Sequence, residues 1–318
     1  MMNRYVTSIV ETIGNTPLLR LDRLAAALDL DGEIYAKLEH MNPSFSKKDR
    51  IALGMIEMAE KQGLLKPGQP VVEVTSGNTG TSLALVCAAK GYRFICCMSK
   101  GNSVERVKMI QAFGGEVVLA EQAPGATKGK VSNDDLILVE KEAERIIEET
   151  GAYYVDQFHN ISNSNAQEAA ANEMWLQSEG KLEVFADFIG TGGTFAGYAR
   201  ALKAHDPSIR CYAVEPEGCA YYMGEVIPGT LHSIQGGGYA KEVDNVERKN
   251  IDGYVTINDD ISIDMTRKLA EIEGIFSGFS SGANVAAAIK LLSGGEKGKK
   301  IGVVINDCGL KYMSTTLF

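Results

Sequence analysis

The chain has 318 residues, 45% of them hydrophobic and 23% charged, which is the composition of an ordinary globular protein. Its 41 acidic and 32 basic residues give a formal net charge of −9, which argues against general binding to the nucleic-acid backbone. At roughly 100–200 residues per domain, this length predicts two lobes or one large α/β unit whose core needs no disulfide bonds.

The cysteine pattern and the N-terminus indicate the compartment. The six cysteines include no CxxC pair and no cysteine–histidine run with zinc spacing. Most of them lie in or beside apolar stretches, which is typical of buried free thiols. The first 16 residues lack the continuous apolar region of a signal peptide, and no apolar run is long enough to span a membrane. We therefore expect a protein of the reducing cytoplasm.

Strand-like and helix-like segments alternate along the first half of the chain. An apolar strand at residues 34–39 precedes a helix predicted from Arg50 to Lys61, where apolar residues recur at helical spacing. A strand at 71–74 leads into an apolar helix that ends at Gly91. The elements that follow are a strand at 93–98, a helix at 103–115, a strand at 116–120, a loop rich in glycine and lysine at 121–132 and a helix at 139–150.

A second alternating series begins after Tyr153. Strands that are apolar throughout and alternate with helices predict parallel sheets covered on both faces. The long loops at 121–132 and 216–250 are the irregular segments, and long loops in compact domains are often functional. The predicted elements of the second series are a helix at 165–180, a strand at 184–190, a helix at 194–205, strands at 209–215 and 253–257, helices at 259–274 and 281–293, and a strand at 300–307.

A glycine-rich turn, IGTGGTFAG at residues 189–197, follows a predicted strand and opens a predicted helix. Backbone N–H groups at such a turn, together with the helix dipole, favour a phosphate. The dinucleotide fingerprint G-x-G-x-x-G is incomplete because Phe195 stands at the third glycine, although Glu215 closes the next strand, where a ribose-binding acid would lie. At this point an NAD site and a structural turn without a ligand both stay open. No triphosphate-binding G-x-x-x-x-G-K-[ST] motif occurs.

A second strand-to-helix turn, VTSGNTG at residues 74–80, offers hydroxyl and amide side chains beside the N–H groups of a helix N-terminus. These are the donors that a carboxylate needs. Taken alone, the turn is equally a helix cap, because Thr and Asn are preferred caps. A third loop at 277–284 presents Ser280 and Ser281 ahead of a helix, and capping is the simpler interpretation there as well.

Two adjacent lysines, Lys47 and Lys48, lie between the strand at 34–39 and the helix predicted to begin at Arg50. A lysine in a desolvated pocket can bind an aldehyde covalently, because desolvation lowers its pKa. Two anion-binding turns, a strand-end lysine and a small hydroxyl are together the groups of a pyridoxal phosphate site. The phosphate would then lie on one turn and the carboxylate of an amino acid on the other.

Seven motifs along the chain occur in the order in which one enzyme family has them. They are IGNTPLLRL, KLEHMNPSFSKKDR, TSGNTG, GTGGT, HSIQGGGY, GFSSGANVAAAI and DCGLKYMSTTLF. By these motifs the chain resembles the cysteine synthase (O-acetylserine sulfhydrylase) and cystathionine β-synthase family of fold type II pyridoxal phosphate enzymes. The resemblance implies two three-layer α/β lobes with mostly parallel sheets, similar to the β subunit of tryptophan synthase. We expect a smaller mobile lobe at 47–155 and a larger cofactor-anchoring lobe at 1–46 and 156–318, with the cofactor in the cleft.

The resemblance also implies which residues bind the cofactor. Lys48 aligns with the lysine that binds pyridoxal 5'-phosphate covalently, and it would also remove the α-proton of the substrate as general base. Lys47 stands where the family usually has an apolar residue, and we expect its charge to face solvent or the phosphate. Asn78 would bind the 3-hydroxyl oxygen of the cofactor and Ser280 its pyridine nitrogen. The residues expected to hold the phosphate are Gly190, Thr191, Gly192, Gly193 and Thr194.

By the same resemblance, four residues would bind the carboxylate of the substrate, namely Thr75, Ser76, Thr79 and Gln157. The sequence FHNISNSN that follows departs from the family pattern, and we expect His159 within it to be an exposed loop residue. The segment 215–229 also departs, and its Tyr221, Tyr222 and Met223 are expected in the core or in an interface. These departures lie where the selectivity for substrate and nucleophile would be determined.

The expected function follows from the residue at the pyridine nitrogen. A neutral serine there, in place of a carboxylate, makes the ring a weaker electron sink, which favours loss of a β-leaving group over transamination. The leading hypothesis is cysteine synthase, which converts O-acetylserine and sulfide into cysteine and acetate. The alternative is a cysteine-consuming β-lyase or β-synthase that releases hydrogen sulfide and forms serine, lanthionine or cystathionine, and an NAD-dependent oxidoreductase is more distant. The resemblance also implies a homodimer and docking of the C-terminal tail of serine acetyltransferase.

Overall fold

The computed structural model describes residues 5–75, 77–100, 104–124 and 133–318. The chain divides by its internal contacts into two compact units: unit 1 contains residues 1–13 and 48–162, and unit 2 contains residues 14–47 and 163–318. Unit 1 therefore reaches beyond the expected lobe at 47–155 and includes the N-terminal segment. The mobility of the smaller unit stays a prediction.

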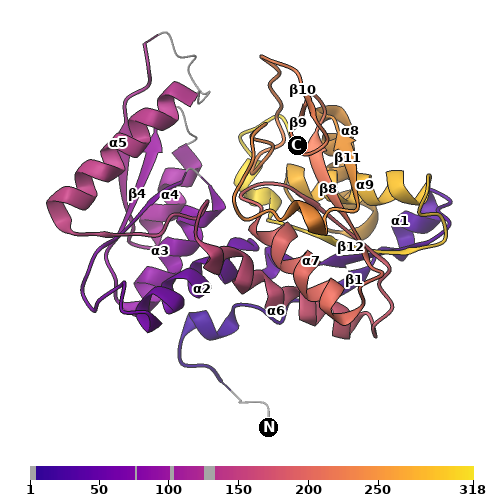
Figure 1. The fold of residues 1–318 in the computed structure, drawn as a ribbon, viewed down its shortest axis with the longest axis horizontal. Helices are drawn as coiled ribbons and strands as arrows, with labels where there is room; N and C mark the ends of the chain where they lie inside the picture. Colours follow the sequence, from indigo (N-terminus) through magenta and orange to yellow (C-terminus); the bar gives the residue numbers. More distant parts are fainter. Residues whose placement is uncertain (1–4, 76, 101–103, 125–132) are drawn as a thin grey trace. The chain divides into compact units, whose positions relative to one another are not determined.

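Unit 1 is built on a four-stranded parallel sheet in the order β5-β4-β3-β6. The strands are β3 (Val71–Val74), β4 (Phe94–Ser99), β5 (Glu116–Ala120) and β6 (Tyr153–Tyr154). The helices are α2 (Lys48–Lys61), α3 (Asn78–Lys90), α4 (Val104–Ala112), α5 (Asn133–Thr150) and the 3-10 turn η1 (Ile9–Thr12). Figure 1 shows α5 on one side of this sheet and α3 on the other.

The central strands of unit 1 bury both of their faces. Val72 of β3 and Ile95 of β4 pack with Val139 and Ile146 of α5. Because successive side chains of a strand point to opposite faces, Glu73 points to the face that does not carry α5. An acid is therefore buried within an otherwise apolar strand.

Unit 2 is built on a six-stranded sheet in the order β1-β2-β12-β7-β8-β11, in which only β1 is antiparallel to its neighbour. The strands are β1 (Leu18–Arg20), β2 (Glu33–Lys37), β7 (Val184–Phe188), β8 (Arg210–Pro216), β11 (Gly253–Ile257) and β12 (Lys300–Val304). The helices are α1 (Asp22–Ala27), α6 (Ile161–Gln177), α7 (Gly193–His205), α8 (Asp259–Lys268) and α9 (Phe279–Leu292). Shorter elements are the hairpin of β9 (Cys219–Ala220) and β10 (Glu225–Val226), the 3-10 turns η2 (Glu39–Met41), η3 (Arg248–Asn250) and η5 (Gly309–Tyr312), and a π turn at Leu269–Glu273.

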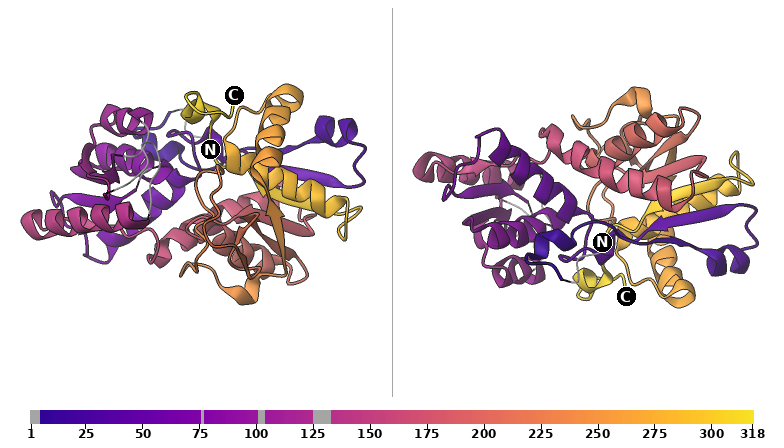
Figure 2. Two further views of the ribbon diagram at one scale, coloured as in Figure 1. Left: turned by 90° about the horizontal axis from the view of Figure 1, so that it is seen from above. Right: turned by 90° about the horizontal axis from the view of Figure 1, so that it is seen from below.

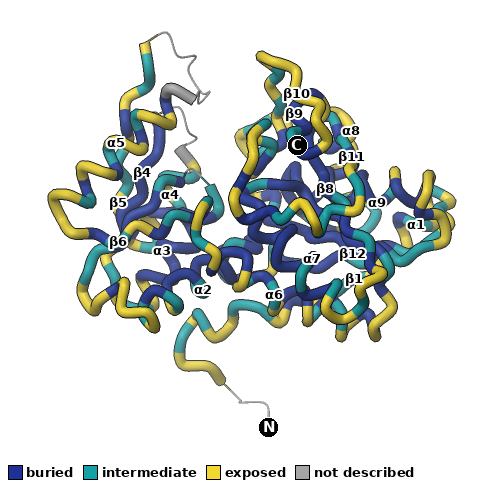
Figure 3. Tube along the Cα trace, in the orientation of Figure 1, coloured by how far each residue is buried: buried dark blue, intermediate teal, exposed yellow. Residues whose placement is uncertain are grey.

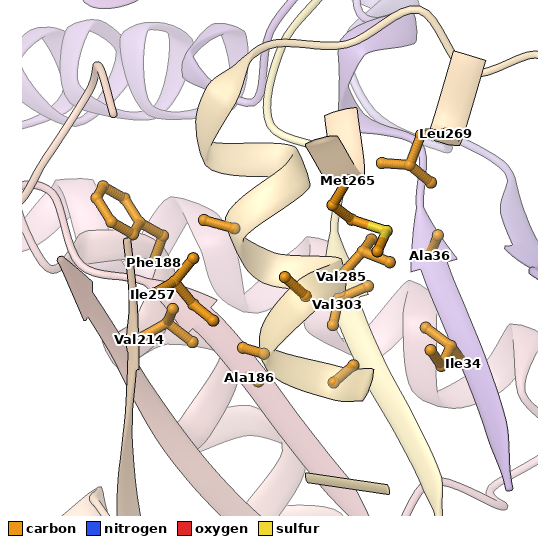
Figure 4. Packing of buried hydrophobic residues seen from close by; sticks show 14 of the residues in the cluster. Ile34, Ala36, Ala186, Phe188, Val214, Ile257, Met265, Leu269, Val285 and Val303 are labelled. Carbon is orange, nitrogen blue, oxygen red and sulfur yellow. The ribbon is translucent and has the colours of Figure 1, made fainter. Parts of the chain in front are cut away.

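The core of unit 2 lies between this sheet and α9, which contacts β7, β11 and β12 (Figures 1 and 2). Figure 4 shows Val285 of α9 close to Val303 of β12, with Ala186 of β7 and Val214 of β8 in the same cluster. The central strands of both units are buried, and the exposed residues lie on outer helix faces and loops (Figure 3). Continuous burial of parallel strands explains why they read as apolar runs without alternation.

The α/β fold with mostly parallel sheets is confirmed, with changes at the ends of elements. Helix α2 begins at Lys48, two residues before the predicted start. Helix α9 begins at Phe279, so Ser280 and Ser281 lie within its first turn and not ahead of it. Among the described residues, no helix has both the length and the apolar character needed to cross a membrane.

Candidate active site

The segment that precedes Lys48 is fixed at the end of β12. Ser46 forms an isolated bridge with Asp307, and the N–H of Lys47 donates to the carbonyl oxygen of Asn306 over 2.9 Å. Lys48 follows as the first residue of α2 and is half-buried. The lysine expected to bind the cofactor therefore starts a helix directly after an anchored piece of backbone.

Lys47 is buried, with 8% of its surface exposed, and its Nζ lies 3.3 Å from each carboxylate oxygen of Asp187. Asp187, the fourth residue of β7, also accepts a hydrogen bond from Asn284 Nδ2 over 3.0 Å. Of the two expectations for Lys47, the one that its charge faces solvent is therefore wrong, and the one that it faces the phosphate stays a prediction. The anchored backbone of residues 46 and 47 directs the side chain into unit 2, where a buried cation needs a paired anion.

In unit 1, the turn that opens α3 brings part of the expected carboxylate site together. Thr79 Oγ1 donates to Gln157 Oε1 over 2.7 Å, and both residues are buried. Thr75 Oγ1 accepts the N–H of Gly77 over 3.4 Å, and Ser76 lies outside the described residues. Gln157 is 78 residues from Thr79 along the chain, so only the fold makes them neighbours.

Asn78 does not cap this helix. Gly77 is the N-cap residue, no side chain forms a cap hydrogen bond, and Asn78 is the first helical residue. Gly77 at the cap position therefore makes the simple interpretation of Asn78 as the N-cap residue wrong, and the hydroxyl of Thr79 is used to bond Gln157. The expected contact of Asn78 with the 3-hydroxyl oxygen of the cofactor stays a prediction.

In unit 2, the turn between β7 and α7 is made of closely packed backbone. Gly192 caps α7 with a left-handed φ of 82°, and α7 begins at Gly193. A Cβ atom on Gly190 would lie 2.4 Å from the carbonyl oxygen of Gly236, and one on Gly193 would lie 2.0 Å from Asn163 Oδ1. The first N–H groups of a helix have no acceptor within it and carry the positive end of its dipole. This turn therefore suits a phosphate and cannot accommodate side chains at these glycines.

The hydroxyl of Thr191 and its backbone are fixed as well. Asn163 Nδ2 donates to Thr191 Oγ1 over 3.0 Å, and Asn245 Nδ2 donates to the Thr191 carbonyl oxygen over 3.1 Å. Both amides come from outside the turn, from α6 and from the segment before η3. The conformation of residues 190–194 is thus held from two sides.

Ser280 is buried in the first turn of α9, and its Oγ accepts a hydrogen bond from Asn306 Nδ2 over 3.0 Å. Ser281 Oγ accepts the backbone N–H of Asn306 over 2.9 Å. Because a hydroxyl has one proton, a Ser280 oxygen that accepts from Asn306 can direct its own proton toward another acceptor. This geometry fits the expected hydrogen bond to a pyridine nitrogen.

Two residues close to the expected site were missed by the sequence reasoning. Glu73 precedes the turn of α3, and its Oε1 lies 3.5 Å from Gln157 Nε2. Asn306 follows β12 and contacts the backbone of Lys47 and the side chain of Ser280. An acid inside the apolar run VVEV was a visible signal for Glu73, whereas no local pattern distinguishes Asn306.

Glu215 and His159 have local partners. The carboxylate of Glu215 accepts backbone N–H groups of Tyr222 and Met223, so this acid holds its own loop and is not free to bind a ribose. His159 is exposed, as expected, and its Nδ1 lies 2.8 Å from Asp156 Oδ1. In the described part of the chain, no group of three or more His, Cys, Asp or Glu side chains could hold a metal ion.

The residues present fit the cofactor that the motifs imply. Unit 2 supplies a side-chain-free turn at a helix N-terminus and a buried hydroxyl whose oxygen is already an acceptor. Unit 1 supplies the lysine that begins α2 and the polar turn of α3. That both sets contact one cofactor stays a prediction.

Comparison with known proteins supports the same chemistry. The sequence profile of the family described as "Pyridoxal-phosphate dependent enzyme" matches residues 9–309. A cysteine synthase of Staphylococcus aureus is 38% identical and aligns over 100% of this chain and 99% of its own length. An O-ureido-L-serine synthase of Streptomyces lavendulae is 39% identical over 98% of this chain and 92% of its own length.

Solved structures are similar over nearly the whole chain. The O-acetylserine sulfhydrylase isoform 3 of Entamoeba histolytica superposes with a TM-score of 0.91 at 33% identity, covering 100% of this chain and 93% of its own. A hydrogen sulfide-producing enzyme of Fusobacterium nucleatum superposes with a TM-score of 0.88 at 34% identity, covering 98% of this chain and 99% of its own.

Proposed function

Since the chain belongs to the cysteine synthase family of pyridoxal-phosphate-dependent enzymes, we propose that it catalyses β-replacement on an activated serine or cysteine. The leading reaction is the formation of cysteine and acetate from O-acetylserine and sulfide. The observation that carries this proposal is the hydrogen bond from the neutral amide of Asn306 to Ser280 Oγ. This hydrogen bond leaves the hydroxyl proton of Ser280 free to be donated to the ring nitrogen of the cofactor. A neutral donor at that nitrogen makes the ring a weaker electron sink, which favours β-replacement over transamination.

The cofactor would be held by groups of both units. Lys48 would bind it covalently, Asn78 would contact its 3-hydroxyl oxygen, and Ser280 would donate to its ring nitrogen. The turn at 190–194 would hold the phosphate with backbone N–H groups, whose positive helix dipole offsets the phosphate charge. When bound, pyridoxal phosphate would withdraw electrons from the α-carbon of an amino acid and so make the α-proton acidic, and the electron pair left on the α-carbon would expel the leaving group from the β-carbon.

The substrate would be bound by its carboxylate and deprotonated by a lysine. Thr79 and Gln157 already share a hydrogen bond and would orient the carboxylate together with Thr75. Once the amine of Lys48 is released by an incoming amino acid, it would take the α-proton as general base. We infer that unit 1 is the mobile lobe and that its closure excludes water from the reacting atoms.

A second candidate reaction consumes cysteine and releases hydrogen sulfide, forming serine, lanthionine or cystathionine. The structural similarity to a hydrogen sulfide-producing enzyme of Fusobacterium nucleatum favours it. The similarity to an O-ureido-L-serine synthase shows that relatives at this identity differ in the compound named as product. The segments 158–165 and 215–229 depart from the family pattern and would contain the residues that choose between these reactions.

The cellular setting is part of the proposal. We infer a cytoplasmic enzyme, because all six cysteines are free and five of them are buried. The homodimer and the docking of a serine acetyltransferase tail rest on the family resemblance. Gel filtration with light scattering would test the dimer, and titration with the tail peptide would test the docking.

The function is tested by offering the purified holoenzyme O-acetylserine, phosphoserine, serine and cysteine separately, each with and without sulfide. Mass spectrometry would identify the amino-acid products, and a sulfide probe would follow hydrogen sulfide. Cysteine made from O-acetylserine supports the leading reaction, whereas hydrogen sulfide from cysteine alone supports the second. Loss of none of the four amino acids would contradict both.

Lys48→Ala is the matching test of the site. It should remove the visible absorbance of the bound cofactor and lower the rate by several orders of magnitude, since it removes both the covalent link and the general base. Lys61→Ala, at the other end of α2, is the control and should leave both unchanged. An unchanged spectrum in Lys48→Ala would refute the assignment.

A further inference from the structure

A buried acid lies beneath the turn that opens α3. Glu73 is the third residue of β3, two positions before Thr75, and only 1% of its surface is exposed. In the parallel sheet it lies opposite Cys96 of β4. Its side chain is thus buried in unit 1, and the proposed function gives it no role.

The polar contacts of Glu73 are amide groups. Gln157 Nε2 lies 3.5 Å from its Oε1, and the backbone N–H groups of Asp156 and Gln157 are near enough to act against the rise of its pKa. Its Oε2 is buried and has no hydrogen-bond partner among the described residues. Among those residues no cation forms an ion pair with it, so the usual way of stabilising a buried carboxylate is absent.

The surroundings favour the protonated acid. Burial, followed by the nearby charge of Asp156, raises the pKa of Glu73 to about 8. Asp156 itself contacts the ring of His159. The thiols and phenols of neighbouring strands near Glu73 have pKa values that burial raises, so they stay uncharged near neutral pH: Cys96, Cys97, Tyr153 and Tyr154.

Glu73 contacts the expected carboxylate site through one side chain. The amide of Gln157 is held at both ends, with Oε1 accepting from Thr79 and Nε2 directed to Glu73. A neutral Glu73 adds no negative charge beside this site. An ionised Glu73 would repel a bound carboxylate and would also compete with it for the Gln157 amide.

We propose that Glu73 is a positioning residue that acts in its protonated form, keeping the carboxylate site of Thr79 and Gln157 uncharged, and that its ionisation weakens the binding of carboxylate ligands. The inference rests on the proposed function for the role of Thr79 and Gln157 as that site. It adds an acid whose proton, and not its charge, supports substrate binding.

The experiment measures the affinity of the holoenzyme for propionate between about pH 6.5 and 9, a range in which propionate stays ionised and has no amine to react. Binding is followed by the visible absorbance of the cofactor. Wild type should lose about tenfold in affinity as pH rises through the titration of Glu73, as expected for one new like charge beside the ligand. Glu73→Gln stays neutral at every pH and should change by less than about twofold.

Two further variants make the test specific. Asp156→Asn removes the negative charge that raises the pKa of Glu73, so the loss of affinity should begin at lower pH. Asn tolerates the positive φ of 53° at this position. Glu215→Gln is the matched control in unit 2, where a buried acid accepts backbone N–H groups of Tyr222 and Met223, and it should behave as wild type.

The outcomes separate this inference from the proposed reaction. A wild-type pH profile in Glu73→Gln, or an unshifted midpoint in Asp156→Asn, overturns the role of Glu73. If Glu73→Gln and Glu215→Gln lose the pH dependence of propionate affinity equally, the role of Glu73 is also overturned. A general effect of removing a buried acid would then explain both results. If no β-replacement activity is found but the propionate profiles differ as expected, the role of Glu73 stands and the reaction assignment falls.

Discussion

One buried acid precedes the turn that opens α7 and another precedes the turn that opens α3, and the two acids differ in their partners. Asp187 on β7 precedes the turn of α7, and its carboxylate contacts Lys47 Nζ and Asn284 Nδ2. Glu73 on β3 precedes the turn of α3, its hydrogen-bond partner among the described residues is the amide of Gln157, and burial raises its pKa to about 8. The first acid forms an ion pair, whereas the surroundings of the second favour its protonated form, so Glu73 is expected to respond to pH near neutrality.

The turns that open α7 and α3 also differ in how tightly they are packed. The turn of α7 packs Gly190 against the backbone of Gly236 and Gly193 against the side chain of Asn163, with no space for a side chain at either glycine. The turn of α3 has open space at Gly77 and presents the side chains of Thr75 and Thr79. A rigid turn suits a phosphate that stays bound, and side chains that can adjust suit a substrate that binds and leaves.

The largest effect is expected from breaking the ion pair of unit 2. Asp187→Asn leaves the charge of Lys47 buried without its partner and should lower the free energy of unfolding by about 3–5 kcal/mol. Urea unfolding would measure it. The double variant Lys47→Met/Asp187→Leu should lose less than Asp187→Asn, because it removes both charges. If the double variant loses as much stability as Lys47→Met and Asp187→Leu lose together, the two charges are not coupled.

The next largest effect is the pH dependence carried by Glu73. Its pKa is about 8 in the folded protein against 4.5 for the free side chain, so folding favours the proton between these values. Its contribution to stability is present at low pH and is lost as pH rises toward 8, by about 3 kcal/mol between about pH 5 and 8. Glu73→Gln should flatten the dependence of urea unfolding on pH by this amount. An identical slope in wild type and variant would contradict the buried proton.

Replacing one glycine of each turn by alanine tests whether the turn of α7 is more tightly packed than the turn of α3. Gly190→Ala places a Cβ atom 2.4 Å from the carbonyl oxygen of Gly236 and should cost about 1–3 kcal/mol of stability and reduce cofactor content. Gly77→Ala meets no atom within 4 Å and should cost less and retain the cofactor. Thermal unfolding and cofactor absorbance would compare them. Equal losses would remove the distinction between a rigid and an adjustable turn.

The smallest effect is expected at the hydrogen bond of the α3 turn. Thr79→Val keeps the shape of the side chain but removes the donor to Gln157 Oε1, which should cost about 1 kcal/mol in binding, or about fivefold in propionate affinity. Cofactor content should not change, because the phosphate turn is in unit 2. A loss of cofactor with unchanged propionate affinity would place Thr79 in the cofactor site instead.

Much of this arrangement could be predicted from local sequence. The apolar strands, the helices between them and the glycine-rich turn are patterns of a few adjacent residues, and the structure confirms them. Asn78 was harder, because a polar residue before an apolar helix resembles a cap, while the observed cap is Gly77. Lys47 was misjudged because a lysine in a polar segment resembles a surface residue, and its anion is 140 residues away.

The sequence alone determined the order of strands and helices and the places of the two strand-to-helix turns, because each depends on periodicity or spacing within one segment, while the resemblance to the family singled out Lys48. Only the tertiary structure decided which charges are paired and which are neutral. The pairing of Lys47 with Asp187 and the raised pKa of Glu73 depend on burial and on partners distant in the chain, because those surroundings determine the free energy of a charge.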